Sequence, residues 1–406
     1  MTVGLMRSAL VLGLLSCVGP FAIDMYLPAM PAIQAGLGTS VAGVQATITA
    51  YFVAFGLAQL IYGPWADQAG RKPPLYAGLA IFIIGSLACA FAPTIEWLVA
   101  GRGLQGLGGA VLMVIPRAII RDLHTGPAAT RLMALVMLVI SVSPFLAPLA
   151  GSGLIAIWDW RVIFLVLGAV AVLSLFMTGF LLPETLAERD RVPVNLANLW
   201  RGAKGLLVDP TFVGLTMLGG FGMASFFVFI ASAAFVYTQE FGLSSVQFSL
   251  AFAVNALGFF ASSQFAAPLG ERLGPRQVVA AAAAGFGVAT LVLLAVVLAG
   301  YGSLTVVIAG LFMANVCLGL VIPTTMVMAL DDHGDVAGLA SSLGGTLQML
   351  VGGAMIAAAG PFFDGTALPM IAAIAVCGVV AFALSRFVLA RQRTSAAHLV
   401  AARPQN

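Results

Sequence analysis

The sequence predicts an all-α membrane protein with twelve transmembrane helices in two six-helix, pseudo-symmetric bundles. Three observations predict this fold: the composition, a series of long stretches without charge, and a sequence repeat half a chain apart. Of the 406 residues, 61% are hydrophobic and 8% are charged, whereas about a quarter of the residues in a soluble domain are charged. This composition excludes a water-soluble globular protein.

The stretches without Asp, Glu, Lys or Arg are long enough to cross a bilayer, which takes about 20 apolar residues in a helix. They include residues 25–66, 132–158, 211–239, 241–270, 277–330, 336–363 and 365–385. The alternating pattern of a membrane β-barrel is absent, so the spans are predicted to be helices, which satisfy their own backbone hydrogen bonds. We expect these helices at residues 8–33, 42–64, 73–93, 96–120, 130–156, 161–182, 211–237, 245–269, 276–299, 303–330, 336–362 and 366–389.

The basic residues predict the orientation of the chain. In this topology fifteen of the 18 Lys and Arg residues fall on the side of the N-terminus, and only Arg161 falls on the opposite side. Arg102 and Arg117 lie within the fourth helix. An excess of Lys and Arg marks the cytoplasmic side, so both termini are predicted to be cytoplasmic, in the bacterial inner membrane.

The polar stretch at residues 183–210 predicts a cytoplasmic linker between an N-terminal bundle at 1–182 and a C-terminal bundle at 211–390, with a tail at 391–406. The segment G-P-W-A-D-Q-A-G-R-K at 63–72 returns as A-P-L-G-E-R-L-G-P-R at 267–276, an offset of 204 residues. Internal repeats of this kind are typical of secondary transporters.

The remaining composition excludes several classes of site. The net charge of +3 is not the footprint of a nucleic-acid-binding protein. The four cysteines stand singly in apolar segments and the three histidines lie far apart, so neither a disulfide framework nor a metal site is expected. We expect no cofactor. The first apolar segment is predicted to be a span rather than a cleaved signal peptide, since similar segments follow along the chain.

Asp24 is the acid that stands out, because the other acids fall at helix ends or in connections. A carboxylate within a span is costly, so it should face the protein interior and exchange a proton there. The alternative is an Asp24 near the outer end of its helix that only caps it or reaches the interface. Arg102 is expected at a comparable depth, where it would meet Asp24 either as a gate for proton release or as a static ion pair. Gln105, one turn on, would hold either group.

The same helix contains G-x-G-x-x-G at Gly101, Gly103 and Gly106, which formally matches a dinucleotide-binding fingerprint. No strand precedes it, so we interpret the glycines as points of close helix packing instead.

Two further segments are candidate gates. After the second helix, Gly63, Asp67, Gly70 and Arg71 form a charged turn. Arg71 is expected to pair with Asp122, and Asp67 to face the N-terminus of a helix from the other half. The alternative is that the basic residues only set orientation. In the fifth helix, Pro144, Pro148 and Gly151 are expected to bend the helix and allow close packing.

A pocket for an organic molecule needs aromatic and soft apolar walls with a few polar groups. The candidates for this pocket are Tyr26, Tyr51, Phe55, Met223, Phe226, Phe227, Asn255, Asn315 and Gln348.

These motifs resemble the major facilitator superfamily, and within it the drug/proton antiporters of the bicyclomycin and chloramphenicol resistance (Bcr/CflA) family. The resemblance spans nearly the whole chain. It rests on I-D-M-Y-L-P-A-M-P (23–31), A-Q-L-I-Y-G-P-W-A-D-Q-A-G-R-K-P (58–73), G-R-G-L-Q-G (101–106), R-D (121–122), W-R-V-I-F (160–164) and P-E-T-L (183–186).

The resemblance implies the major facilitator fold, with Asp24 as the site that couples proton to substrate, Arg102 as its partner, and the loop of Asp67 and Arg71 as a gate. The fifth-helix motif departs from the family's G-P-x-x-G-G and reads A-P-L-A-G-S at 147–152. Ser16 stands where some relatives carry a second acid, which argues against a two-carboxylate site.

The sequence thus predicts a monomeric, proton-coupled exporter of small hydrophobic drugs, phenicol- or bicyclomycin-like, that works by alternating access. A metabolite exporter or importer with the same fold is the alternative. An intramembrane enzyme lacks support, because the spans hold no second carboxylate, H-E-x-x-H or Ser–His pair. A receptor or scaffold would bind a ligand without moving it.

Overall fold

The computed structural model describes residues 3–124, 126–331 and 333–401, and no β-strand occurs within them. Twelve helical segments of this part of the chain are long and apolar enough to cross a membrane, which confirms the predicted number. They begin and end close to the predicted helices, between Val11–Leu37 at one end of the series and Ala367–Arg391 at the other.

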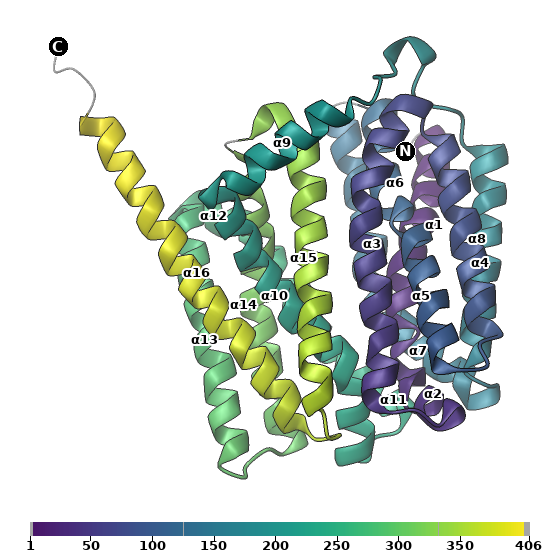
Figure 1. The fold of residues 1–406 in the computed structure, drawn as a ribbon, viewed down its shortest axis with the longest axis vertical. Helices are drawn as coiled ribbons and strands as arrows, with labels where there is room; N and C mark the ends of the chain where they lie inside the picture. Colours follow the sequence, from purple (N-terminus) through teal and green to yellow (C-terminus); the bar gives the residue numbers. More distant parts are fainter. Residues whose placement is uncertain (1–2, 125, 332, 402–406) are drawn as a thin grey trace. The chain divides into compact units, whose positions relative to one another are not determined.

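Several spans consist of more than one helix, which the apolar pattern did not predict. The elements shown in Figure 1 are α1 (Val3–Asp24), η1 (Leu27–Ala29), α2 (Met30–Leu37), α3 (Val41–Ala69), α4 (Lys72–Ala90), α5 (Ile95–Gly109), α6 (Val111–Leu123), α7 (Gly126–Ile157), α8 (Arg161–Leu181), η2 (Glu188–Asp190), α9 (Leu196–Val208), α10 (Pro210–Phe235), the π-helical η3 (Val236–Glu240), α11 (Ser245–Ser263), α12 (Ala266–Leu273), α13 (Pro275–Leu298), α14 (Leu304–Asp331), η4 (Gly334–Val336), α15 (Ala337–Ala359), η5 (Gly360–Phe362) and α16 (Ala367–Ala401).

The chain forms two compact units. Unit 1 comprises residues 1–195, 230–253 and 356–366, and unit 2 comprises residues 196–229, 254–355 and 367–406. These units differ from the predicted bundles, because short pieces of the later helices pack with the first eight helices. The division into halves at 182 and 211 therefore remains a prediction from the repeat. Of the predicted tail, residues 391–401 continue α16, and residues 402–406, with Arg403, lie outside the described residues.

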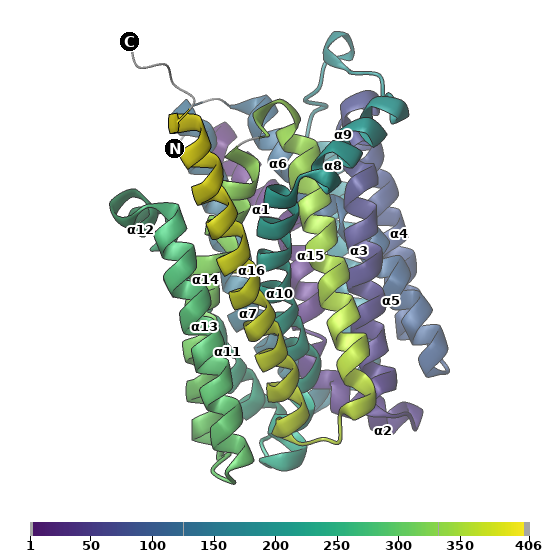
Figure 2. The same ribbon diagram turned by 60° about the vertical axis from the view of Figure 1, so that its left-hand side comes forward.

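Unit 1 is built on close contacts among its spanning helices. In Figure 1 these helices run side by side along the long axis, with α5 packed on α3 and α4, α8 on α4, and α7 on α1. In unit 2, α13 packs on both α14 and α16, and Figure 2 shows these three helices together.

The glycines of the G-x-G-x-x-G segment lie within α5, as the packing interpretation predicts. A Cβ at Gly101 would stand 2.8 Å from the Cys89 Sγ of α4, and one at Gly106 would stand 3.0 Å from the Tyr51 Cα of α3. Only Gly103 has open space around it. Two of the three glycines therefore let neighbouring helices approach.

Candidate functional site

The first span is interrupted at Asp24, and two prolines explain why. In an α-helix the carbonyl of residue i accepts from the N–H of residue i+4. Pro28 has no N–H to give to the carbonyl of Asp24, and Pro31 has none for the carbonyl of Leu27. Accordingly α1 ends at Asp24, and the chain continues through η1, in which the N–H of Met30 bonds to the carbonyl of Leu27.

The Asp24 carboxyl group lies in the interior of unit 1, with 6% of the residue exposed. The side chain is therefore enclosed by protein rather than exposed at the end of its helix. The hydroxyl of Ser143 on α7 donates a hydrogen bond to Asp24 Oδ2 at 3.1 Å. Ser143 is itself fully buried and directly precedes Pro144, so the fifth span contacts the acid through one of its candidate gating segments.

A second contact from the fifth span lies just beyond the break. Gly151 of α7 packs so closely on the chain after Asp24 that a Cβ there would overlap the carbonyl oxygen of Met25, and would stand 3.1 Å from Pro28 Cγ. Ser143 and Gly151 are eight residues apart, a little over two helical turns. The fifth span therefore follows the first one across its interruption, and Pro148 lies between the two contacts.

Arg102 is fully buried beside the same segment, but no ion pair within 4.0 Å joins it to Asp24. Its guanidinium lies between two aromatic rings, 4.7 Å from the ring centre of Tyr26 and 4.4 Å from that of Tyr51. Its Nη1 donates to the carbonyl of Ala22 at 3.0 Å, two residues before Asp24. The expected depth is therefore correct, whereas the expected direct contact is not formed in this structure.

The surroundings of Arg102 explain how its charge is stabilised without Asp24. A buried cation needs compensating groups, and two ring faces at this distance contribute favourably when water is absent. Arg102 Nη1 also donates to Gln105 Oε1, and Gln105 Nε2 donates in turn to Ser86 Oγ at 2.8 Å. The predicted hydrogen bond of Gln105 is therefore formed with Arg102 and not with Asp24.

The two tyrosines are themselves fixed to the first and third helices. Tyr51 donates to the carbonyl of Gly19 at 3.3 Å, and the hydroxyl groups of Tyr26 and Thr47 are 2.7 Å apart. Both tyrosines are 0% exposed. Arg102 lies over both rings, and the place of Tyr26 and Tyr51 in a drug pocket stays a prediction.

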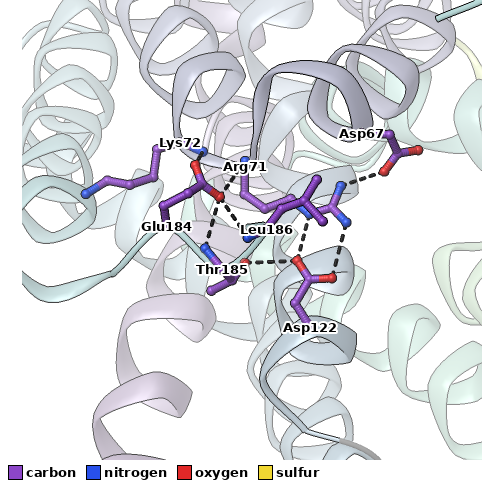
Figure 3. Close-up of polar contacts among 7 residues, drawn as sticks. All are labelled: Asp67, Arg71, Lys72, Asp122, Glu184, Thr185 and Leu186. Atoms are coloured by element: carbon purple, nitrogen blue, oxygen red, sulfur yellow. Dashed lines mark hydrogen bonds and ion pairs between the residues drawn. The ribbon is translucent and has the colours of Figure 1, made fainter. Parts of the chain in front are cut away.

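The charged turn between α3 and α4 forms a dense cluster, shown in Figure 3. Arg71 donates from Nε to Asp122 Oδ2 at 2.7 Å and from Nη2 to Asp122 Oδ1 at 3.2 Å, which confirms the predicted pair. Its Nη1 bonds to Asp67 Oδ1 at 2.6 Å, an i,i+4 pair whose acid is 58% exposed. Burial alone would lower the pKa of Arg71, but its bonds to Asp122 and Asp67 raise it. 

Glu184 is a member of this cluster that the sequence reasoning missed. Its carboxylate accepts from the N–H groups of Arg71 and Lys72 at 2.9 and 3.0 Å, at the start of α4, and from those of Thr185 and Leu186 at 2.9 and 3.1 Å (Figure 3). An anion is favoured at a helix N-terminus. The sequence signal for Glu184 is the P-E-T-L motif at 183–186, which resembles the family's motif but does not by itself predict these contacts.

The chain between Leu182 and Val192 makes three further hydrogen bonds to this cluster and the start of α4. Thr185 Oγ1 donates to Asp122 Oδ2 at 2.9 Å, the N–H of Val192 donates to the carbonyl of Asp67 at 3.0 Å, and Lys72 Nζ donates to the carbonyl of Leu182 at 2.9 Å. Gly70 has φ +95, and a Cβ there would stand 2.7 Å from Glu184 Oε2. Only glycine suits that backbone and that contact. Gly63, by contrast, has no neighbour within 4 Å of such an atom.

Unit 1 also has polar contacts at the end opposite this cluster. Gln45 of α3 is buried and donates to Ser232 Oγ at 3.1 Å and to the carbonyl of Ala231 at 3.3 Å. Ser152 of α7, next to Gly151, lies 2.8 Å from Ser249 Oγ. None of these was predicted, because small polar residues inside apolar helices give little sequence signal.

The other pocket candidates are distributed over both units. Phe55 is buried in unit 1 and stacks on Tyr51 at 5.9 Å. In unit 2, Met223 and Phe226 are half-buried on one face of α10, and Phe226 stacks on Phe259 at 5.7 Å. The buried members of unit 2 are Phe227, which packs on Gly352, and Asn255, Asn315 and Gln348. The amide of Gln348 lies over Gly219, one turn before Met223.

Comparisons with known proteins bear on this arrangement. The model of the Major Facilitator Superfamily matches residues 12–357. An uncharacterised MFS-type transporter, YdgK of Bacillus subtilis, is 33% identical over 95% of this chain and 96% of its own. The bicyclomycin resistance protein homolog of Haemophilus influenzae is 28% identical over 95% and 97%. The human organic anion transporter MFSD10 shares the fold, with a TM-score of 0.64 and 20% identity over 95% of this chain and 99% of its own.

We predict that Glu184→Gln loosens the start of α4. Burial raises the pKa of Glu184, but its four backbone hydrogen bonds lower it more, and the net shift is downward. Because folding lowers the pKa of Glu184, its carboxylate stabilises the folded protein fully at pH values above its ordinary pKa. This stabilisation is lost as the pH falls through the lowered pKa. Amide hydrogen exchange at Arg71 and Lys72 should accelerate by up to about tenfold at neutral pH, since the carboxylate is partly exposed.

Acidification should abolish the difference between the wild type and this variant, because both then lack the charge. Glu188→Gln, an exposed acid of the same linker, is the matched control and should leave this exchange unchanged. Equal exchange in wild type and Glu184→Gln at neutral pH would show that the carboxylate does not hold the turn.

A second prediction compares two glycines of α7. Gly151→Ala should displace the fifth span from Met25 and lower both the melting temperature and transport, since overpacking of a close contact costs about 1–3 kcal/mol. Gly153→Ala adds the same atom two residues away, where nothing lies within 4 Å, and should be neutral or slightly stabilising. Thermal melting and transport of the two purified variants test this. Identical behaviour would rule out the close contact at the break.

Proposed function

Because this chain belongs to the Major Facilitator Superfamily, we propose that it exports small hydrophobic drugs by proton antiport, with Asp24 as the proton-carrying group. The chain is a multi-pass bacterial membrane transporter and not an enzyme. Its similarity to a bicyclomycin resistance protein homolog favours drug efflux over metabolite transport.

The single observation that carries proton coupling is the position of Asp24. The acid is buried at an interruption in the middle of the first span, it accepts a hydrogen bond from Ser143, and no basic side chain among the described residues pairs with it. An ionisable group in such a place is a functional candidate by default, because its charge is expensive to keep there. The interruption lets the backbone around it move more readily than a continuous helix would.

The proposed cycle uses competition at this carboxyl group. With the outer side open, Asp24 binds a proton and the drug leaves; with the inner side open, the proton leaves and drug binding follows. One carboxylate implies one proton per drug. For a neutral drug each cycle then has available about 2.3 kcal/mol per 100 mV and about 1.4 kcal/mol per pH unit.

Arg102 has a supporting role in this proposal. Its guanidinium is fixed by Tyr26, Tyr51 and the carbonyl of Ala22. Because Ala22 is two residues before Asp24, a movement of the first span at Asp24 would also move this carbonyl and change its bond to Arg102. A direct Asp24–Arg102 pair would belong to another state of the cycle. Proton release would be favoured there, because a nearby cation stabilises the carboxylate.

The clusters at the two ends of unit 1 are the proposed gates. The cluster of Asp67, Arg71, Asp122 and Glu184 would order the inner turn, and the contacts of Gln45 and Ser152 would break when the outer end opens. Phe55 of unit 1, and Phe226 and Gln348 of unit 2, stay the proposed drug-contacting residues. The protein is proposed to act as a monomer in the inner membrane with both termini cytoplasmic.

The decisive variant is Asp24→Asn, which keeps the size of the side chain and its hydrogen bonding but removes the titratable group. Everted vesicles with an imposed pH gradient should show no drug accumulation by this variant, while drug binding persists. The same vesicles and right-side-out vesicles together give the direction of transport, which separates an exporter from an importer.

Asp159→Asn is the matched control, since this acid is exposed and pairs only with Arg161 of its own turn, at 3.2 Å. It should transport at the wild-type rate. Drug accumulation by folded, inserted Asp24→Asn at the wild-type rate would refute proton coupling through this residue.

A further inference from the structure

The linker contains a helix, α9 (Leu196–Val208), which the transport proposal does not use. Its sequence is LANLWRGAKGLLV, with two basic residues and no acid. The sequence predicts a polar linker here, and the structure folds this part of it as an amphipathic helix. Figures 1 and 2 both show α9 running obliquely to the spanning helices.

One face of α9 packs on unit 2. Leu206 is 2% exposed, and Gly202, one turn earlier, lies so close to α15 that a Cβ there would stand 2.8 Å from the Leu339 Cδ2. Residues four apart share a helix face, so this face is already occupied by the protein.

A second face of α9 is apolar and uncovered in unit 2. Trp200 and Leu207, seven residues apart, lie on one stripe and are 71% and 46% exposed, and Val208 beside them is 71% exposed. Arg201 and Lys204 are exposed along the edge of this stripe. A tryptophan with basic neighbours beside an apolar stripe is the pattern of a helix that lies in the membrane interface.

The position of α9 in the chain puts it directly before a membrane-spanning helix. The helix ends at Val208, and the spanning α10 begins at Pro210. The nearest acid, Asp209, is engaged elsewhere: its Oδ2 lies 3.1 Å from His333 Nε2, and its Oδ1 accepts from the N–H of Thr211. The surface that α9 offers is therefore basic and apolar together.

We propose that α9 is an interfacial anchor that seats Trp200, Leu207 and Val208 among the acyl-chain ends of the adjoining leaflet, with Arg201 and Lys204 on anionic phospholipid headgroups. The charge complementarity favours a lipid surface over a second copy of the chain, whose α9 carries the same positive charge. The anchor would hold α9, and with it the start of α10, against the membrane.

The test uses the full-length protein in vesicles of phosphatidylcholine, with or without phosphatidylglycerol. The difference in fluorescence between the wild type and Trp200→Phe gives the emission of Trp200 separately from that of the other tryptophans. Lipids brominated near the headgroup should quench this emission, and phosphatidylglycerol should increase the quenching. In Arg201→Gln/Lys204→Gln the ratio of membrane-bound to unbound α9 in phosphatidylglycerol vesicles should fall by about thirtyfold. Each of the two lost charges contributes about 1 kcal/mol to binding an anionic membrane.

Arg272→Gln/Arg276→Gln is the matched control, because it also removes two exposed arginines, one near the end of α12 and one at the start of α13. It should keep the wild-type response. Trp200 emission that aqueous iodide quenches and brominated lipid does not, or that a second copy of the protein shields instead, would overturn the anchor. Equal quenching with and without phosphatidylglycerol would overturn the anionic headgroup as its partner.

Discussion

The arrangement of the site depends on the interruption of the first span, where Pro28 and Pro31 cannot give hydrogen bonds to the carbonyls of Asp24 and Leu27. Without these two bonds the first helix ends at the acid instead of passing it. A carboxyl group on an unbroken helix would be held at a fixed place on that helix. At an interruption the backbone around the carboxyl group is less constrained by helical hydrogen bonds. The neighbouring α7 contacts this segment twice, through Ser143 at Asp24 and through Gly151 just beyond the break.

The treatment of charge differs sharply between the middle of unit 1 and the end that carries the turn between α3 and α4. At this turn, Arg71 pairs with Asp122 and Asp67, and Glu184 is held by backbone N–H groups, so each of these charges has a partner. In the middle, Arg102 is stabilised by rings and neutral oxygens, and Asp24 has a hydroxyl group as its hydrogen-bond donor. Fully paired charges are suited to holding a turn in place. A buried acid without a cation is suited to gaining and losing a proton.

The sequence predicts the spans, the burial of Asp24 and the Arg71–Asp122 pair, because charge in an apolar chain is rare and each charged residue is conspicuous. It does not predict the break, although the spacing of Asp24 and Pro28 contains the signal, because the apolar run continues through it. It overestimates the direct contact of Arg102 with Asp24, since the compensating groups are aromatic rings and a backbone carbonyl. Glu184 is more than 100 residues from the turn it holds, and no local pattern relates the two.

The most direct measurement is the number of protons released when drug binds to the purified transporter in weakly buffered solution. Chloramphenicol or bicyclomycin, whichever the protein binds, should displace a single proton per bound molecule from the wild type. From Asp24→Asn the same binding should displace none. Binding without proton release by the wild type across the pH range in which it is folded would contradict the central role given to this acid.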